Sequence, residues 1–371
     1  MKLVVNRDLF ARALARVQGV VSRKSSMQAI SNVLLQASTD GRLRVAATDL
    51  DVTFDGAIAA RIGEPGEITV DGKRLYEVIR SLPGEEVDLS VGDAHQVKLV
   101  CKNTEFTLLG ATADQYPELP SAAGVAFTPV DGLALRQLID RTIFSVSTDE
   151  SRPNLNGVFF RSLGGGRLRM VSTDGHRLSQ GERDAGREGD IAEHDGVIIP
   201  RKGVSELSRL LGEVGADVRF GFLDNNLVVG AEDLTLFVRL IDAAFPDYRQ
   251  VIPKASGKKA VVNRLAFLDS LKRISILASE RTHGVRIEVH EGRMVLSSDN
   301  PDLGKAREEL PIEGYNGDEL VIAFNARYVR DILGILDAEK VELALNESLA
   351  PGLFREHGNE DYLFVVMPMR L

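Results

Sequence analysis

Two helical spacings of apolar residues recur along the chain, and each of them occurs three times. The first places apolar side chains at i, i+4, i+7 and i+11, which is one face of an α-helix; it covers residues 10–21, 135–146 and 267–278. The second uses i, i+3 and i+7 and covers residues 75–82, 204–211 and 329–336. The middle copy of the first spacing has Thr142 at an apolar place, so its apolar face is weaker. Six helices are predicted, two in each third of the chain.

Between the predicted helices lie short runs in which apolar and polar residues alternate, such as "ITVDG", "VDLSV", "VKLVC" and "FTLLG". Alternation with a period of two, bounded by turn residues, predicts β-strands. Each third therefore reads as a strand, a helix, several strands, a second helix and several more strands. This order predicts an α+β fold of three repeated domains, each with two helices and antiparallel sheets and each of a usual domain size.

Two segments rich in proline and other turn residues are the expected connections between these domains. They are "YPELPSAAG" at 116–124 and "FPDYRQVIPKASGKK" at 245–259. The predicted domains are accordingly residues 1–124, 125–253 and 254–371.

A turn built from reactive residue types is also repeated. Asp49, Asp174 and Asp299 are 125 residues apart, and each follows an alternating run that begins Gly-Arg. The middle copy, "VSTDGHRLSQ" at 171–180, is the one that carries a histidine, His176. Three interpretations are open: a structural turn held by the aspartate side chain, a non-catalytic binding surface around His176, and a hydrolase using Asp174 and His176. Because the chain has no GxSxG elbow, no Walker loop and no GxGxxG after a strand, the hydrolase is least favoured and no catalytic residue is assigned.

The composition narrows the function further. With 44% hydrophobic and 27% charged residues, the chain is typical of a soluble globular protein. Its one cysteine, Cys101, excludes an internal disulfide framework and is typical of a reducing cytoplasm. No HExxH or paired Cys/His spacing occurs, so neither a metal ion nor another cofactor is expected. No apolar run approaches about 18 residues and the start of the chain is strand-like, so neither a membrane partner nor a signal peptide is expected.

The net charge of −9 conceals an uneven distribution. The predicted helical segments together carry +9, so the rest of the chain carries −18; the segments are 7–17, 73–82, 131–142, 201–211, 264–273 and 327–336. Aligned by their apolar positions, the helices have basic residues at equivalent places: Arg16, Arg141 and Arg273 in the first family, and Lys73, Lys202 and Arg327 in the second. Arg80 and Arg209 share a further position, at which the third copy has Gly334.

This repetition favours helices that face a polyanion over helix faces that are merely mixed in charge. The aromatic content is only 6% and no recognition helix is evident, which indicates contacts to phosphates rather than bases, and hence sequence-independent binding of duplex DNA. Since an acidic exterior weakens adsorption to DNA, retention would have to come from a closed ring. Three domains are half of a sixfold arrangement, which a head-to-tail homodimer completes. A repeat scaffold that binds only proteins is the alternative, and the basic positions argue against it.

Five segments, in chain order, carry a resemblance to a known family: "LNGVFF" (155–160), "STDGHRL" (172–178), "VIIPRKGVSEL" (197–207), "FPDYRQVIP" (245–253) and "VVMPMRL" (365–371). Over its full length the chain resembles the bacterial DNA polymerase III β subunit, the sliding clamp. The resemblance implies a ring-shaped head-to-tail homodimer of six similar domains, whose helices line a hole that holds duplex DNA. It implies a non-catalytic, cytoplasmic and nucleoid-associated processivity subunit of the replicative polymerase. Its further partners would be an ATP-driven clamp loader, other DNA polymerases and repair proteins.

Partners of this family insert short hydrophobic linear motifs into a cleft between the second and third domains. Matched residue by residue, that cleft comprises Leu155, Thr173, Gly175, His176, Arg177, Leu178, Pro246, Val251, Val365, Met367, Pro368, Met369, Arg370 and Leu371. Arg177 and Arg370 would hold polar groups of the peptide.

The resemblance also implies a DNA contact at Lys24, beside Arg23. It implies a dimer seam at which Phe106 and Leu108 meet Ile276 and Leu277. The chain departs from the family at Pro153 and Asn154, where an aromatic pair is common, and at Gln250, where arginine is common.

Overall fold

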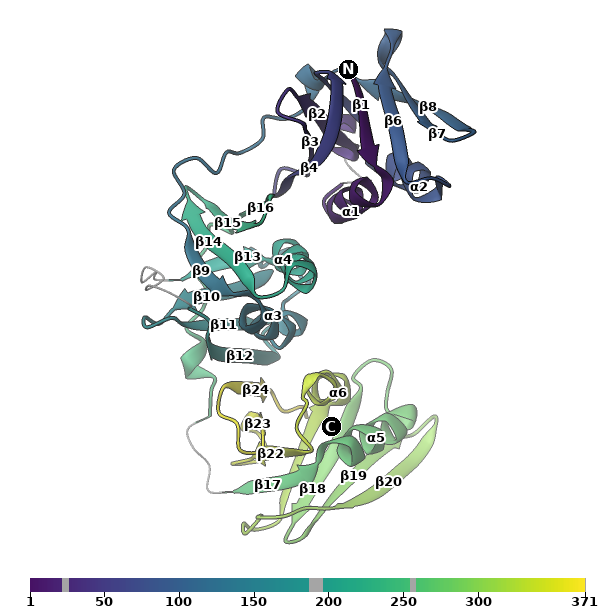
Figure 1. Ribbon diagram of the computed structural model, residues 1–371. Helices are drawn as coiled ribbons and strands as arrows, with labels where there is room; N and C mark the ends of the chain where they lie inside the picture. The colour runs from purple at the N-terminus through teal and green to yellow at the C-terminus, as the bar shows by residue number, and fades with distance from the viewer. Residues whose placement is uncertain (22–26, 187–195, 254–257, 371) are drawn as a thin grey trace. The chain divides into compact units, whose positions relative to one another are not determined.

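The computed structural model describes residues 1–21, 27–186, 196–253 and 258–370 of the chain (Figure 1). Two of the predicted site residues, Lys24 and Leu371, lie outside these ranges. The described residues form two compact units, one built mainly from Met1–Leu133 and Lys202–Leu240, the other from Ala134–Ala185 and Ile241–Leu371. The middle third of the chain is divided between the units because its strands belong to the sheets of both. The division into three domains at residues 124 and 253 stays a prediction.

The first unit contains a sheet of twelve antiparallel strands, in the order β1-β6-β7-β8-β5-β2-β3-β4-β16-β15-β14-β9. β1 also pairs with β4, so strands β1 to β8 form a closed series. The strands are β1 (Lys2–Asn6), β2 (Asn32–Ser38), β3 (Arg42–Thr48), β4 (Val52–Glu64), β5 (Gly66–Asp71), β6 (Glu86–Val91), β7 (Gln96–Cys101), β8 (Thr104–Ala111), β9 (Thr128–Asp131), β14 (Asp217–Leu223), β15 (Asn226–Ala231) and β16 (Leu234–Arg239).

The second unit contains two antiparallel sheets, with the orders β13-β10-β11-β12-β24-β23-β22-β17 and β20-β19-β18-β21. The strands are β10 (Gly157–Ser162), β11 (Arg167–Thr173), β12 (Arg177–Asp184), β13 (Val197–Pro200), β17 (Lys259–Asn263), β18 (Gly284–His290), β19 (Arg293–Asn300), β20 (Gly304–Pro311), β21 (Leu320–Asn325), β22 (Lys340–Ala344), β23 (Gly352–Glu356) and β24 (Tyr362–Val366).

The six predicted helices are present in the described residues. They are α1 (Arg7–Val17), α2 (Gly72–Ser81), α3 (Gly132–Asp140), α4 (Arg201–Val214), α5 (Arg264–Ile274) and α6 (Ala326–Ile335). Side chains cap five of their amino-terminal ends in the described residues; the capping residues are Asn6, Asp71, Asp131, Asn263 and Asn325, whose oxygens accept hydrogen bonds from backbone N–H groups of the first turn. No described helix has the length and apolar character needed to cross a membrane.

The apolar faces read from the sequence are the buried faces of these helices. Phe10 and Leu14 of α1 and Phe267 of α5 are fully buried, and α1 packs beside α2 as α5 packs beside α6 (Figure 1). The middle copy departs from the pattern because α3 ends at Asp140. Thr142 therefore lies beyond the helix, fully buried, and donates its hydroxyl hydrogen to the carbonyl oxygen of Leu138 at 2.7 Å.

Two strand pairings join elements from different thirds of the chain in equivalent ways. β4 pairs with β16 in the first unit, with Phe54 opposite Leu236, and β12 pairs with β24 in the second, with Ser179 opposite Phe364. The remaining members of these two strand families are β20 and β8. Within the described residues β20 pairs only with β19, and β8 pairs with β7 and, over two residues, with β5. One edge of β20 and most of one edge of β8 are thus left unpaired by the described part of the chain.

Helix α4 packs closely on β16 through a glycine. A Cβ atom on Gly203 would overlap Cγ1 of Val238, which is fully buried. Gly334, within α6, has no atom within 4 Å of such a Cβ position. The two helical glycines therefore differ in the space available and form a matched pair.

We expect Gly203→Ala to lower the free energy of unfolding by about 1–3 kcal/mol, since extra volume in a packed core forces side chains or backbone to shift. Gly334→Ala should leave it unchanged or raise it by up to about 1 kcal/mol, because alanine favours the helix. Urea unfolding followed by circular dichroism measures both. Equal effects of the two substitutions would contradict the close packing at Gly203.

Candidate partner-binding cleft

The repeated aspartate builds a turn. Oδ1 of Asp174 accepts hydrogen bonds from the backbone N–H groups of His176 (2.9 Å) and Arg177 (3.0 Å), and Gly175 between them has a φ of +90°, which favours glycine. Asp49 does the same in the first copy, accepting from the N–H of Val52 at 2.7 Å. The Asp174 side chain thus stabilises the backbone of the turn, as the structural interpretation requires.

The third copy of this turn is built differently. There Oδ1 of Asn300 accepts from the N–H of Asp302 at 3.0 Å, while Asp299 pairs with Lys305 at 2.6 Å. The regular spacing of the three aspartates therefore overstates the likeness of the three turns.

The middle turn forms one wall of a groove that encloses about 280 Å³ in the second unit. Its lining residues come from the turn before β10, from β11, β12 and the turn between them, from the 246–251 segment, and from β24 and the residue after it: Leu155, Thr173, Gly175, Arg177, Leu178, Pro246, Asp247, Tyr248, Val251, Val365 and Met367. The base is apolar and buried, with Leu155, Leu178 and Val365 each less than a tenth exposed. Val251 (40% exposed) and Met367 (36%) present apolar surface to solvent. The groove can accept an apolar side chain from a partner.

Aromatic packing supports the segment that carries Pro246 and Val251. Tyr248 is buried with its ring near those of Phe159 and Phe245, which stack on each other at 5.0 Å. The Tyr248 hydroxyl oxygen accepts a hydrogen bond from Arg169 at 3.1 Å. Tyr248 and Asp247 line the groove although neither was singled out from the sequence. The signal available was their place inside the segment 245–253.

Nine of the fourteen residues expected in the cleft line this groove, and five do not. His176, Pro368, Met369 and Arg370 lie outside its lining, and Leu371 lies outside the described residues. Two backbone hydrogen bonds lead the chain away from the groove. The N–H of Met367 donates to the carbonyl oxygen of His176 (2.9 Å), and that of Met369 donates to the carbonyl oxygen of Ala323 (2.8 Å).

The Arg177 side chain is engaged through all three of its nitrogen atoms. Its guanidinium contacts Asp174 (3.1 Å), Asp331 of α6 (2.6 Å) and the carbonyl oxygen of Phe144 (2.6 Å). It also lies over the ring of Tyr328, 4.5 Å from the centroid. Only 12% of the side chain is exposed, so Arg177 shapes the groove wall by holding β12 against α6, and its donors are committed before any peptide arrives.

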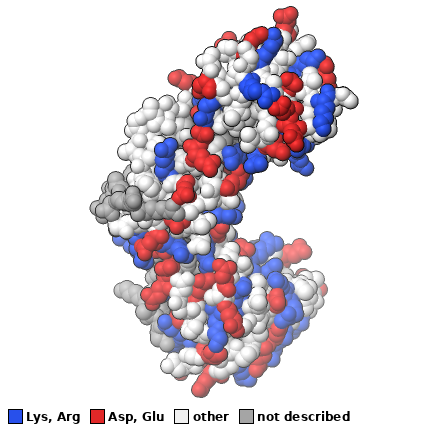
Figure 2. All heavy atoms as spheres, in the orientation of Figure 1, with Lys and Arg blue, Asp and Glu red and all other residues white. Residues whose placement is uncertain are grey.

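The basic helix positions differ in how far they are available to a polyanion. Six of the eight described ones lie within 4 Å of a carboxylate: Arg16 with Glu213, Lys73 with Glu77, Arg141 with Asp337 and Glu356, Lys202 with Asp49, Arg209 with Glu206, and Arg273 with Glu308. Arg80 and Arg327 are exposed, and neither has a side-chain hydrogen bond or ion pair within the described part of the chain. On the face seen in Figure 2, basic and acidic side chains are intermixed rather than separated.

Arg141 departs most from the expected place on an exposed helix face. It follows the end of α3, its side chain is only 12% exposed, and it bonds Glu356 (2.9 Å) and Asp337 (2.7 Å) beneath the ring of Tyr362. A phosphate could reach this guanidinium only by displacing a carboxylate. The position equivalent to Arg16 and Arg273 thus supplies an internal ion pair here.

Glu356 is the buried partner in this network. Burial by itself raises the pKa of its carboxyl group, but hydrogen bonds from Arg141, the N–H of Asp337 and Asn359 outweigh burial and lower that pKa below its usual 4.5. The folded state is therefore stabilised by ionised Glu356, and this contribution is lost as the pH falls through the lowered value.

The residues expected at the dimer seam lie on separate units and are surface residues. Phe106 (36% exposed) and Leu108 lie on β8 of the first unit, while Ile276 (73% exposed) and Leu277 lie in the turn that follows α5 in the second.

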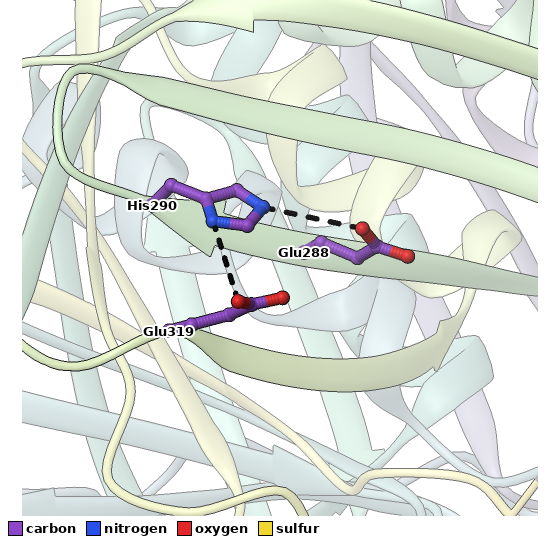
Figure 3. Close-up of side chains that lie close together, drawn as sticks. All are labelled: Glu288, His290 and Glu319. Carbon is purple, nitrogen blue, oxygen red and sulfur yellow. Dashed lines mark ion pairs between the residues drawn. The ribbon is translucent and has the colours of Figure 1, made fainter.

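One group of possible metal ligands occurs in the described residues, on β18 and just before β21. His290 lies between Glu288 (4.0 Å) and Glu319 (3.8 Å), as Figure 3 shows. Glu288 also accepts a hydrogen bond from Arg286 at 2.9 Å. Glu288 and His290 are partly buried and Glu319 is exposed, and we assign no metal to the group.

Comparison with known proteins decides the family. The three models of the DNA polymerase III beta subunit match in order: the N-terminal domain at residues 1–120, the central domain at 130–247 and the C-terminal domain at 249–370. The chain belongs to the DNA polymerase III beta subunit family. The resemblance drawn from the five sequence segments is thereby confirmed, as is the α+β fold of repeated clamp domains.

Similar proteins cover the whole chain. It is 35% identical to the beta sliding clamp of Pseudomonas aeruginosa and 35% identical to that of Caulobacter vibrioides, each over 100% of both chains. A crystal structure of a sliding clamp from Bartonella birtlesii bound to griselimycin superposes with a TM-score of 0.93 at 35% identity, also over 100% of both chains.

We expect Glu356→Gln to lower the free energy of unfolding at pH 7 by about 1–3 kcal/mol, because it removes a buried ion pair. Arg141 keeps its other ion pair, with Asp337. The difference from the parent protein should shrink as the pH falls below 4.5, where Glu356 becomes protonated. Unfolding midpoints in urea between pH 7 and pH 3 test this. Glu339→Gln, at an exposed position, is the control, and a pH-independent effect of Glu356→Gln would contradict the linkage.

Proposed function

We propose that this chain forms a ring-shaped head-to-tail dimer around duplex DNA and tethers its partners through the groove between β12, β24 and the 246–251 segment. As a member of its family, the chain is a DNA sliding clamp of the polymerase and is not itself an enzyme. The observation that carries this function is the match of all three beta-subunit domain models, in order, along one chain. These matches also support the division into domains at 1–124, 125–253 and 254–371.

Ring closure is supported by the two unpaired strand edges. A second copy that places its β8 along β20 repeats the pairing of β16 with β4 and of β24 with β12. Since β8 and β20 belong to different ends of the same chain, two copies close head to tail and leave neither edge exposed. Phe106 and Leu108 then lie at the seam with Ile276 and Leu277.

For the DNA contacts we propose exposed basic positions of the helices, chiefly Lys73, Arg273 and Arg327, with Lys24 as a further contact. Arg16, Lys202 and Arg209 are weaker candidates, because each is paired with a carboxylate within the first unit. Arg141 is left out because its guanidinium is held by Glu356 and Asp337. Contacts of this kind read phosphates and not bases, so the DNA sequence is immaterial.

The partners of the groove are proteins that carry a short linear motif with apolar residues: the replicative polymerase, other DNA polymerases, repair proteins and the clamp loader. An apolar base with one flexible methionine at the rim suits several related motifs. The griselimycin-bound Bartonella birtlesii clamp supplies a probe for this chain. We place the protein in the cell interior, on the nucleoid.

We expect the chain to sediment at twice its 40.5 kDa and, once loaded by the clamp loader onto a nicked plasmid, to remain bound when salt is raised enough to screen phosphate contacts. Cutting the plasmid once should release it, because a ring leaves through a free DNA end. Gel filtration of the DNA-bound fraction before and after cutting measures this. Release by salt alone from the intact circle would show adsorption instead of encirclement.

We expect Val251→Glu to weaken binding of griselimycin at least about tenfold, since it places a charge on the apolar wall of the groove. Isothermal titration calorimetry gives the affinity. Leu349→Glu is the matched control, because Leu349 is 62% exposed in the same unit and does not line the groove. Equal affinities for the two variants would place the binding site elsewhere.

A further inference from the structure

A contact inside the first unit joins α4 to the carboxyl-terminal end of α1. The guanidinium of Arg209 donates hydrogen bonds to the carbonyl oxygens of Ala15 (3.0 Å) and Arg16, while Glu206 accepts from its Nε at 3.1 Å. The last carbonyl groups of a helix lack partners within the helix, and the helix dipole makes this end attractive to a cation. Arg209 therefore caps α1 from a helix that belongs to the next third of the chain.

The same pair of side chains stands on α2. Counted from the first residue of the apolar i, i+3, i+7 spacing, which is Leu75 in α2 and Val204 in α4, Glu77 corresponds to Glu206 and Arg80 to Arg209. Glu77 and Arg80 are both exposed. In the described part of the chain Arg80 has no ion pair or side-chain hydrogen bond, so its five donors are left to solvent or to another molecule.

The structure also contains an end of a helix that matches α1. In α1 the side chain of Gln18 donates to the carbonyl oxygen of Leu14, and in α5 the hydroxyl of Ser275 donates to that of Leu271, the equivalent residue. The next two carbonyl groups belong to Ala15 and Arg16 in α1 and to Lys272 and Arg273 in α5. The positive side chains there are already paired, since Lys272 bonds Asp269 (2.9 Å) and Arg273 bonds Glu308 (2.9 Å).

The strand register shows which molecule can bring Arg80 and the carboxyl-terminal end of α5 together. β7 and β8 pair like β15 and β16, with two residues in each turn, so Phe106 corresponds to Leu236. β19 and β20 pair like β3 and β4, so Ala306 corresponds to Phe54. Because Leu236 lies opposite Phe54 in this chain, Phe106 of one copy should lie opposite Ala306 of another.

This register also matches charges. At the neighbouring pair of this register, Glu105 of β8 lies opposite Arg307 of β20, and both residues are exposed in this chain. Opposite charges that face each other across a strand pair stabilise it, whereas like charges would oppose it. A second copy of this chain is thus the partner that fits both the unpaired strand edges and the end of α5.

We infer that Arg80 caps the carboxyl-terminal end of α5 in a second copy of this chain, with Glu77 holding its guanidinium, as Arg209 caps α1 within the chain. Arg80 is then a residue of the dimer seam and not a phosphate contact. The inference rests on the proposed ring, which contains this contact twice. The groups that receive the guanidinium are the carbonyl oxygens of Lys272 and Arg273.

The test is the dissociation constant of the dimer without DNA, measured by sedimentation equilibrium over a range of concentrations. Arg80→Ala should raise it about tenfold, which corresponds to about 1.4 kcal/mol shared between the two seams. Arg80→Lys should have a smaller effect, because an ammonium keeps the charge but lacks the guanidinium fork. Arg12→Ala, which removes an exposed arginine of α1 with no proposed role, should leave the constant unchanged.

The outcomes separate the contact from the ring. If the parent protein is dimeric and Arg80→Ala has the same dissociation constant, the cap is overturned and the ring is left intact. Faster loss of that variant from circular DNA would then assign Arg80 to a phosphate contact. A monomeric parent protein overturns both. Because Arg80 is exposed, its variants should keep the parent melting temperature, and a lowered one would show a role within the chain that contradicts the inference.

Discussion

Antiparallel pairing between edge strands is the constraint on which this structure depends. An edge strand presents a row of unpaired N–H and C=O groups, and a chain that repeats one sheet three times produces such an edge at each end of every repeat. Within the chain, four of these edges are paired, β4 with β16 and β12 with β24. The edges of β8 and β20 remain, and they are the ones that a second copy can pair. In the proposed ring, the same interaction that builds each unit therefore also joins the two copies.

Around each internal pairing, a few charged groups join helices to their neighbours. Arg209 caps α1 beside the first pairing, while Arg177 ties β12 to Asp331 of α6 beside the second. The joining arginine belongs to helix α4 in the first case and to strand β12 in the second. Helix α6 cannot supply it, because it has Gly334 at the position that Arg209 occupies in α4. At the second pairing, the arginine that joins the elements is also a wall of the groove. Groove shape and the contact between β12 and α6 are thus mechanically linked.

The paired state of most basic positions bears on how a clamp moves along DNA. An arginine that must leave a carboxylate to reach a phosphate exchanges one ion pair for another, so the net gain is small. Weak contacts of this kind suit a protein that is retained by its topology and slides along the duplex. The negative net charge of the chain, −9, has the same consequence.

The sequence by itself determined the threefold repeat, the six helices, the family and most of the groove lining, because these depend on hydrophobic periodicity and on segments that are local in the chain. Leu155, Leu178 and Met367 came from the resemblance to the family that those segments carry. Only the tertiary structure decided which charged side chains are free. Lys202 and Arg327 occupy equivalent positions in the repeat, yet Lys202 is paired with Asp49 while Arg327 is exposed and has no ion pair among the described residues. The partner of a long charged side chain comes from a distant part of the chain, and no local spacing records it.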